Sequence, residues 1–170
     1  MIPVFLVLVM SYTRDQQWMR HLALFVFVLA ALSDAADGFV ARAYNQKTKL
    51  GAVLDPMADK LMVNLAFVFL AVNHEFRTPV PAWFPVIILS RDAIIVMGAY
   101  LINEFYGPLR VRPRISGKLN TVLQMSSIIV VLLEWGIAHV ILMATIAVSI
   151  LSFIDYMVTG YRQVGNQDRA

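Results

Sequence analysis

The chain has 170 residues, of which 59% are hydrophobic and only 15% are charged. An average soluble domain has about 45–50% apolar and about 25% charged residues, so the composition excludes a soluble globular protein. The net charge of +3 comes without a stripe of basic and aromatic residues, so we expect no nucleic-acid partner, and the absence of cysteine excludes disulfides and zinc–thiolate sites. We expect a single membrane domain over residues 1–170.

Six apolar segments follow one another along the chain and predict an all-α integral membrane protein with a six-transmembrane-helix bundle. The first segment, residues 1–13, is shorter than the roughly 20 residues that a span needs, so we expect a truncated, partial first span. The further spans are expected at residues 21–43, 51–74, 82–104, 116–135 and 137–158. They are followed by a polar tail at residues 159–170.

The basic residues of the loops sort into two groups, because consecutive spans alternate sides of the membrane. One side carries nine: Arg42, Lys47, Lys49, Arg110, Arg112, Arg114, Lys118, Arg162 and Arg169. The other carries three: Arg14, Arg20 and Arg77. Lys and Arg accumulate in cytoplasmic loops, so we predict that loops 42–50 and 105–118 and the C-terminus face the cytoplasm. Only Lys60 and Arg91 remain inside spans.

Four aspartates fall in apolar helices near this predicted cytoplasmic side. Asp34 and Asp37 end the second segment, and Asp55 and Asp59 begin the third. Both spacings place a pair on one helix face, and the short connection predicts an antiparallel hairpin in which the pairs face each other. A charge within a span costs at least about 2.5–3.5 kcal/mol, so a cationic partner is expected. Oxygen-only ligands favour hard ions, and we predict two divalent cations, Mg²⁺ or Mn²⁺.

Small residues surround these aspartates. Gly38, Ala41 and Gly51 leave room for a bulky group to reach the carboxylates, or they serve only as helix-packing positions. Arg42 offers a planar guanidinium that suits a phosphate.

The whole stretch resembles, position for position, the signature of the CDP-alcohol phosphatidyltransferase family. It reads Asp34-x2-Asp37-Gly38-x2-Ala41-Arg42-x8-Gly51-x3-Asp55-x3-Asp59. The resemblance implies transfer of a phosphatidyl group from CDP-diacylglycerol to an alcohol hydroxyl, with release of CMP. The positions that match the family's metal ligands are Asp34, Asp37, Asp55 and Asp59, and Asp59 also matches the proton acceptor. The positions that match the cytidine and pyrophosphate site are Gly38, Ala41, Arg42 and Gly51, with Thr48 as a weaker candidate.

The acceptor alcohol is harder to predict. Candidate residues are Arg91 in the fourth span and the basic cluster Arg110, Arg112, Arg114 and Lys118. Arg91 could equally be a core residue satisfied by a neighbouring carboxylate, and the cluster could be only a positively charged cytoplasmic loop. Arg91 and Asp92 are adjacent and do not share a helix face, so they need not pair with each other.

A second stretch narrows the choice of acceptor by resemblance. Ser116-Gly117-Lys118-Leu119-Asn120-Thr121, followed by Gln124, resembles a stretch of phosphatidylglycerophosphate synthases and of the related cardiolipin synthases. Gly117-Lys118 looks more like the former, whereas Arg91-Asp92 and Asn120-Thr121 look more like the latter. We favour glycerol 3-phosphate as the acceptor, with phosphatidylglycerol as the alternative.

Further expectations follow from the resemblance and from the remaining residues. Family members carry a longer N-terminal stretch, so we expect the true start upstream of Met1, and we expect a homodimer in a bacterial inner membrane. A divalent-cation transporter would need carboxylates near the midplane, and a non-enzymatic scaffold would have no need of four intact aspartates. The tryptophans Trp18, Trp83 and Trp135 lie at predicted interfaces. Glu104, Glu134 and Asp155 lie near span ends and are assigned no function.

Overall fold

The computed structural model describes the backbone of residues 1–43, 51–106 and 115–167, and the side chains of residues 1–34, 36, 60–102, 104–105 and 116–160. Within these ranges the fold is all-α, as predicted, with six helices and no strand. The helices are α1 (Ile2–Ser11), α2 (Gln17–Ala43), α3 (Gly51–Val72), α4 (Trp83–Tyr106), α5 (Ile115–Leu132) and α6 (Ala138–Gln167).

The predicted segments match these helices except at some ends. Helix α1 has 10 residues, or about 15 Å of length, which is short of the roughly 30 Å thickness of a bilayer core. Helix α6 continues to Gln167, well into the segment predicted as a polar tail. Hydropathy limits how far a helix can lie in lipid, but it does not end the helix, because polar residues extend a helix into water without loss of backbone hydrogen bonds.

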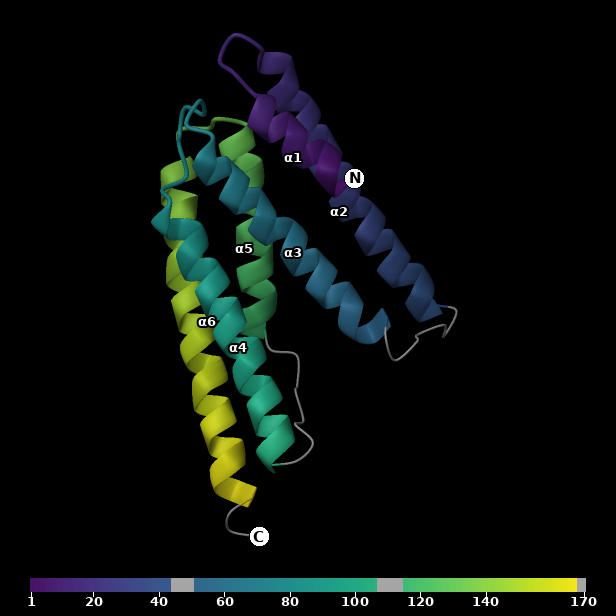
Figure 1. Cartoon of the computed structure of the whole chain (residues 1–170), viewed down its shortest axis with the longest axis vertical. Helices are drawn as coiled ribbons and strands as arrows, with labels where there is room; N and C mark the ends of the chain where they lie inside the picture. The colour runs from purple at the N-terminus through teal and green to yellow at the C-terminus, as the bar shows by residue number, and fades with distance from the viewer. Residues whose placement is uncertain (44–50, 107–114, 168–170) are drawn as a thin grey trace.

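The helices run up and down between two ends of the molecule (Figure 1). The turns at residues 12–16, 73–82 and 133–137 lie at one end, which we call the turn end. Helices α2, α4 and α6 finish in the direction away from the turn end, and α3 and α5 begin there; we call this side the motif end, although in Figure 1 only α4 and α6 reach the bottom of the view. The segments predicted to face the cytoplasm, 42–50, 105–118 and the C-terminus, are therefore attached to the helix termini of the motif end.

The helices form two groups that are joined by α3 and by a contact between α2 and α5. Helices α4 and α5 both pack against α6, and α1 packs against α2. Helix α3 crosses between the groups and contacts α1, α4 and α5 (Figure 1). Buried aromatic pairs hold these crossings: Phe5 and Phe27 join α1 to α2 with ring centroids 5.4 Å apart, and Phe67 and Phe84 join α3 to α4 at 4.8 Å.

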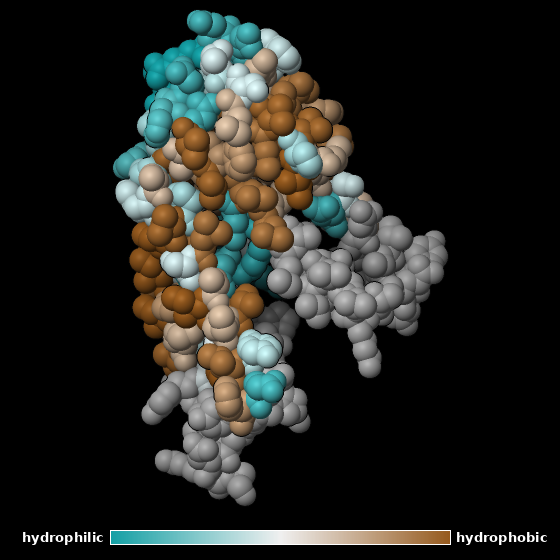
Figure 2. All heavy atoms as spheres, in the orientation of Figure 1, coloured by the Kyte–Doolittle hydropathy of each residue, from teal (hydrophilic) through white to brown (hydrophobic). Residues whose placement is uncertain are grey.

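The surface is apolar and part of the interior is polar. Large hydrophobic side chains such as Met97, Phe105 and Leu151 are exposed, whereas Ser149 and Ser152 are completely buried. Figure 2 shows hydrophobic residues along the middle of the described surface and hydrophilic ones gathered at its upper end. This distribution is expected for helices whose surroundings are lipid, since polar groups there must be satisfied inside the protein.

Two helices of the described chain are long and apolar enough to cross a membrane, Trp83–Ile102 and Ala138–Gly160. The other apolar stretches found are shorter: Ile2–Ser11, Lys60–Val72 and Ser116–Leu132. The structure thus supports six helices and two clear candidate spans, and the six-span bundle stays a prediction. Trp18, Trp83 and Trp135 are exposed and belong to helix ends or turns at the turn end, in keeping with the predicted interfacial belt.

Candidate active site

The motif lies on two consecutive helices that meet at the motif end. Asp34 and Asp37 belong to the last part of α2, and Asp55 and Asp59 to the first part of α3. Both stretches are helical, so the predicted spacing on one helix face holds for the backbone of each pair. The end of α2 and the beginning of α3 lie near each other in the view of Figure 1, as expected for a hairpin.

Only part of the predicted metal site is described at the level of side chains. The Asp34 side chain is exposed. The side chains of Asp37, Asp55 and Asp59 lie outside the described residues. The prediction that the two pairs face each other concerns these side chains and stays a prediction. Among the described side chains no group of three or more His, Cys, Asp and Glu forms a metal cluster.

The residues predicted to bind the CDP-lipid flank the same helix ends. Gly38, Ala41 and Arg42 belong to α2, and Gly51 is the first residue of α3. The side chains at these positions lie outside the described residues. Thr48 lies outside them entirely. Of the predicted acceptor cluster, Lys118 on α5 is exposed, whereas Arg110, Arg112 and Arg114 lie outside the described residues.

Arg91 is buried and pairs with its neighbour Asp92, which agrees with the alternative of a core arginine satisfied by a neighbouring carboxylate. Its Nη1 lies 2.6 Å from Asp92 Oδ1, and its Nη2 donates to Ser152 Oγ on α6 at 2.8 Å. A long guanidinium can fold back over one helix turn, and in a low-dielectric interior an unpaired charge is costly. The pairing therefore follows from burial, which helix-face geometry alone does not consider.

Lys60 extends this ion pair to a third helix, and the sequence analysis had given it no role. Its Nζ lies 3.1 Å from Asp92 Oδ1. Asp92 thus accepts two cations on one oxygen, with Lys60 from α3 and Arg91 from α4. The only sequence signal for this triad was that Lys60 and Arg91 are the basic residues left inside predicted spans, where charges are expensive.

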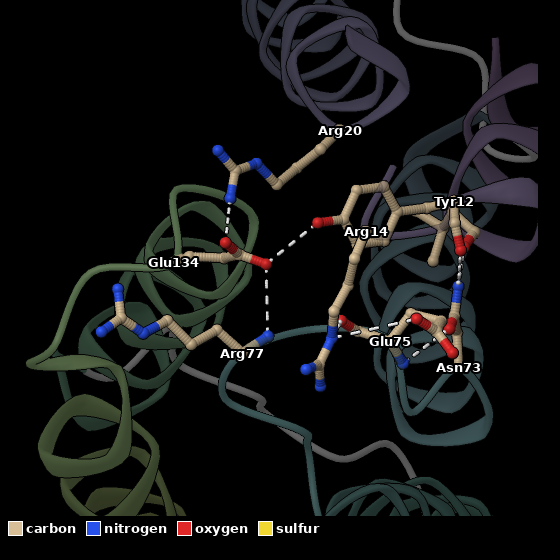
Figure 3. Close-up of polar contacts among 8 residues, drawn as sticks. Tyr12, Arg14, Arg20, Asn73, Glu75, Arg77 and Glu134 are labelled. Carbon is tan, nitrogen blue, oxygen red and sulfur yellow. Dashed lines mark hydrogen bonds and ion pairs between the residues drawn. The ribbon is translucent and has the colours of Figure 1, made fainter. Parts of the chain in front are cut away.

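A second polar site, which we call the Glu134 cluster, lies at the turn end and consists of Tyr12, Arg20, Asn73, Arg77 and Glu134 (Figure 3). Glu134 Oε1 accepts the Tyr12 hydroxyl at 3.1 Å and the backbone N–H of Arg77 at 3.2 Å, and Oε2 forms an ion pair with Arg20. Asn73 Nδ2 donates to the carbonyl oxygens of Val9 and Tyr12 at 2.7 and 3.0 Å. The cluster thus joins the turns after α1, α3 and α5 to the first part of α2.

Glu134 is held at this place by an unusual backbone conformation. Its φ of 53° is left-handed, and the N–H groups of Glu134 and Trp135 bond to the carbonyls of Val131 and Val130. This is the capping turn in which glycine usually occupies the position of Glu134, so a side chain there costs about 1–2 kcal/mol. The contacts of the carboxylate offset this cost and give Glu134 a structural role that the sequence did not indicate.

The contacts also shift two pKa values. Burial alone would raise the pKa of Glu134, but the hydrogen bonds from Arg77 and Tyr12 and the charge of Arg20 outweigh it and lower the pKa below its ordinary value. The pKa of Tyr12 is raised by burial first, and then by its hydrogen bond to the negative Glu134. Both shifts favour an ionised Glu134 beside a neutral Tyr12 in the folded protein.

The fold is all-helical, with many hydrophobic side chains on its surface and polar residues in part of its interior. This combination is typical of a membrane protein. Residues 1–151 match the family described as CDP-alcohol phosphatidyltransferase. The chain belongs to this family, as its motif indicated.

Several curated proteins are similar to this chain. A probable phosphatidylglycerophosphate synthase of Mycobacterium tuberculosis is 30% identical over 171 residues, which cover 97% of this chain and 78% of that protein. A CDP-diacylglycerol–glycerol-3-phosphate 3-phosphatidyltransferase of Sodalis glossinidius is 34% identical over 137 residues, or 78% of this chain and 70% of that protein. The human cardiolipin synthase (CMP-forming) is 32% identical over 121 residues, or 62% of this chain. The match spans 39% of the length of that synthase.

Proposed function

We propose that the protein transfers the phosphatidyl group of CDP-diacylglycerol to the hydroxyl of an alcohol and releases CMP, with glycerol 3-phosphate as the alcohol. The observation that carries this proposal is the complete motif on the end of α2 and the beginning of α3, at the motif end. The family match and the names of two of its relatives point to the same reaction.

The donor set of the motif fits divalent cations. Four carboxylates supply only hard oxygen ligands, which suits Mg²⁺ or Mn²⁺, and the Asp34 side chain is exposed. The residues that would hold two such ions are Asp34, Asp37, Asp55 and Asp59. When bound, the ions would neutralise charge on the oxygens around the reacting phosphorus.

The protein's own residues would bind the donor and move one proton. Arg42 would hold the pyrophosphate through its guanidinium, with Thr48 beside it, and Gly38, Ala41 and Gly51 would leave space for the cytidine. The alcohol oxygen forms a bond to the phosphorus that carries the diacylglycerol, and the bond from this phosphorus to the CMP oxygen breaks. The hydroxyl proton passes to the carboxylate of Asp59.

The acceptor would bind through basic residues of the bundle and of the loop between α4 and α5. We propose for this role Arg91 and the cluster Arg110, Arg112, Arg114 and Lys118. Phosphatidylglycerol, the acceptor of a cardiolipin synthase, is the second candidate, favoured by the likeness to the human cardiolipin synthase. Both alcohols carry a phosphate, so the basic residues suit either.

We further propose that all six helices form one membrane bundle with the motif end at the cytoplasmic side of a bacterial inner membrane. The nine basic residues predicted for that side against three for the other support this orientation. A homodimer is proposed from the resemblance to the family.

Release of CMP in detergent tests the proposal. The purified protein is given CDP-diacylglycerol and Mg²⁺ together with glycerol 3-phosphate, phosphatidylglycerol, inositol phosphate or serine in separate reactions. We expect release with glycerol 3-phosphate, its loss in Asp59→Asn, and weaker CDP-lipid binding in Arg42→Ala. Release with phosphatidylglycerol alone would identify a cardiolipin synthase. Release with none of the acceptors would contradict the proposal and favour a scaffold.

A further inference from the structure

The interior of the bundle contains polar residues, most of which have no role in the proposed reaction. Figure 2 shows hydrophilic atoms at the bottom of a hollow between hydrophobic side chains, about halfway along the molecule. Among the buried polar residues of the described chain are seven on four helices, each more than nine-tenths buried: Asn64 on α3, Arg91 and Asp92 on α4, Asn120 and Gln124 on α5, and Ser149 and Ser152 on α6.

We call these seven residues and Lys60 the polar layer, and contacts between helices involve all of them except Asn64 and Gln124. Lys60 on α3 bonds to Asp92 on α4, Arg91 on α4 bonds to Ser152 on α6, and Ser149 on α6 donates to Asn120 Oδ1 on α5 at 2.5 Å. Asn64 lies one helix turn after Lys60, on the same face of α3. Gln124 likewise lies one turn after Asn120, on the same face of α5.

Three polar atoms in this layer lack a hydrogen-bond partner among the described residues. They are Asn64 Oδ1, Arg91 Nε and Gln124 Nε2. A buried polar atom left unpaired costs about 1–3 kcal/mol, and most buried polar atoms in folded proteins are paired. Asn64 and Gln124 could be replaced by apolar residues of the same size without this cost, so their presence points to a partner that is absent from the protein chain itself.

The atoms without a hydrogen-bond partner indicate which chemical groups the missing partner carries. Asn64 offers an acceptor and Gln124 offers a donor, and a hydroxyl is the simple group that can satisfy both. Lys60 and Arg91 carry two positive charges against one negative charge on Asp92, and the Lys60 side chain is 41% exposed. The surplus positive charge at the open side of the layer suits an anion.

We propose that Asn64 and Gln124 determine specificity by binding the free hydroxyl of a glycerol phosphate group, with Lys60 toward its phosphate. The inference rests on the proposed function and names the part of the acceptor that these residues recognise. Glycerol 3-phosphate and the head group of phosphatidylglycerol share this chemistry. In both, one hydroxyl of the glycerol reacts and the central hydroxyl remains free for the two amides.

The test compares each acceptor with an analogue that lacks the central hydroxyl. Glycerol 3-phosphate is paired with propanediol phosphate, and phosphatidylglycerol with phosphatidylpropanediol. A site that hydrogen-bonds a hydroxyl rejects the analogue because its own polar groups stay unpaired. We expect the wild-type protein to prefer the true acceptor by about 10- to 100-fold in kcat/KM. The pair of acceptors that shows this preference identifies the source of the head group.

Two nearly isosteric variants and one control test whether Asn64 and Gln124 bind the hydroxyl. Asn64→Leu and Gln124→Met should each reduce the preference to within about threefold, while KM for CDP-diacylglycerol stays unchanged. Ser127→Ala is the matched control, since Ser127 is also buried on α5 but is paired with Thr145. It should retain the preference. Folded variants that keep the full preference would overturn the proposal.

A binding measurement separates this proposal from the proposed function. If the wild-type protein releases no CMP with any acceptor, the transfer reaction fails as a function. Stabilisation against thermal unfolding by glycerol 3-phosphate or by phosphatidylglycerol, each added separately, then decides the site. Stabilisation that is lost in Asn64→Leu and kept in Ser127→Ala supports it, and a wild-type protein that neither compound stabilises overturns it.

Discussion

The ion pair between Arg20 and Glu134 should be the strongest polar contact at the turn end, and Glu134→Gln tests it. The two side chains are only 11% and 17% exposed. The substitution removes the negative charge and leaves Arg20 with a buried guanidinium. It retains an oxygen that can accept from Tyr12 or from the Arg77 N–H, and it leaves the left-handed backbone of residue 134 with a side chain of the same size.

The magnitude follows from this burial. Removing one partner of a buried ion pair costs about 3–5 kcal/mol, and the oxygen kept by glutamine recovers part of the lost hydrogen bonding. We therefore expect a loss of about 2–4 kcal/mol. Arg14 and Glu75 provide a control in the same region, because they are 69% and 51% exposed with 3.9 Å between Nε and Oε2. Glu75→Gln should cost no more than about 1 kcal/mol.

Equilibrium unfolding in mixed detergent micelles, followed by circular dichroism, measures both variants against the wild type. Glu134→Gln should shift the unfolding transition more than Glu75→Gln, because the cost comes from burial and not from charge alone; equal shifts would refute this. The double variant Arg20→Met with Glu134→Gln removes the stranded cation and should be more stable than Glu134→Gln alone. No recovery would show that the loss has another cause.

Three further predictions concern titration and packing. Because the pKa of Glu134 is lowered in the folded protein, its ionised carboxylate contributes fully to stability above the ordinary pKa of 4.5, and this contribution is lost as pH falls through the lower folded value. Below pH 4.5 the stability of the wild type should therefore fall more steeply with pH than that of Glu134→Gln. Parallel pH profiles of the two proteins would contradict this. Asp92→Asn should lower stability by about 3 kcal/mol, because a buried guanidinium loses its counter-charge; an unchanged unfolding midpoint would contradict the pairing. A Cβ at Gly117 would lie 2.8 Å from the Tyr156 hydroxyl oxygen, so Gly117→Ala should cost about 1–3 kcal/mol. This cost should shrink in a Tyr156→Phe background, and an equal cost in both backgrounds would exclude the hydroxyl as its cause.

Much of the fold and of the motif could be predicted because both depend on local order in the chain. Six apolar segments predicted six helices, and the spacing from Asp34 to Asp59 predicted two helical pairs, since both rest on residues a few positions apart. The polar interior could not be predicted in this way. Hydropathy left Lys60 and Arg91 as isolated charges in spans, and it gave no indication that Asp92 would bind both.

The sequence alone therefore determined the family, the all-helical class and the position of the acidic motif, because residue type and short-range spacing are sufficient for each. Only the tertiary structure decided which charges are paired. Glu134 meets Arg20 across 114 positions of the chain and Tyr12 across 122, and Lys60 meets Asp92 across 32. Such partners are selected by helix crossings and by the high cost of an unpaired charge in a low-dielectric interior, and neither can be read from neighbouring residues.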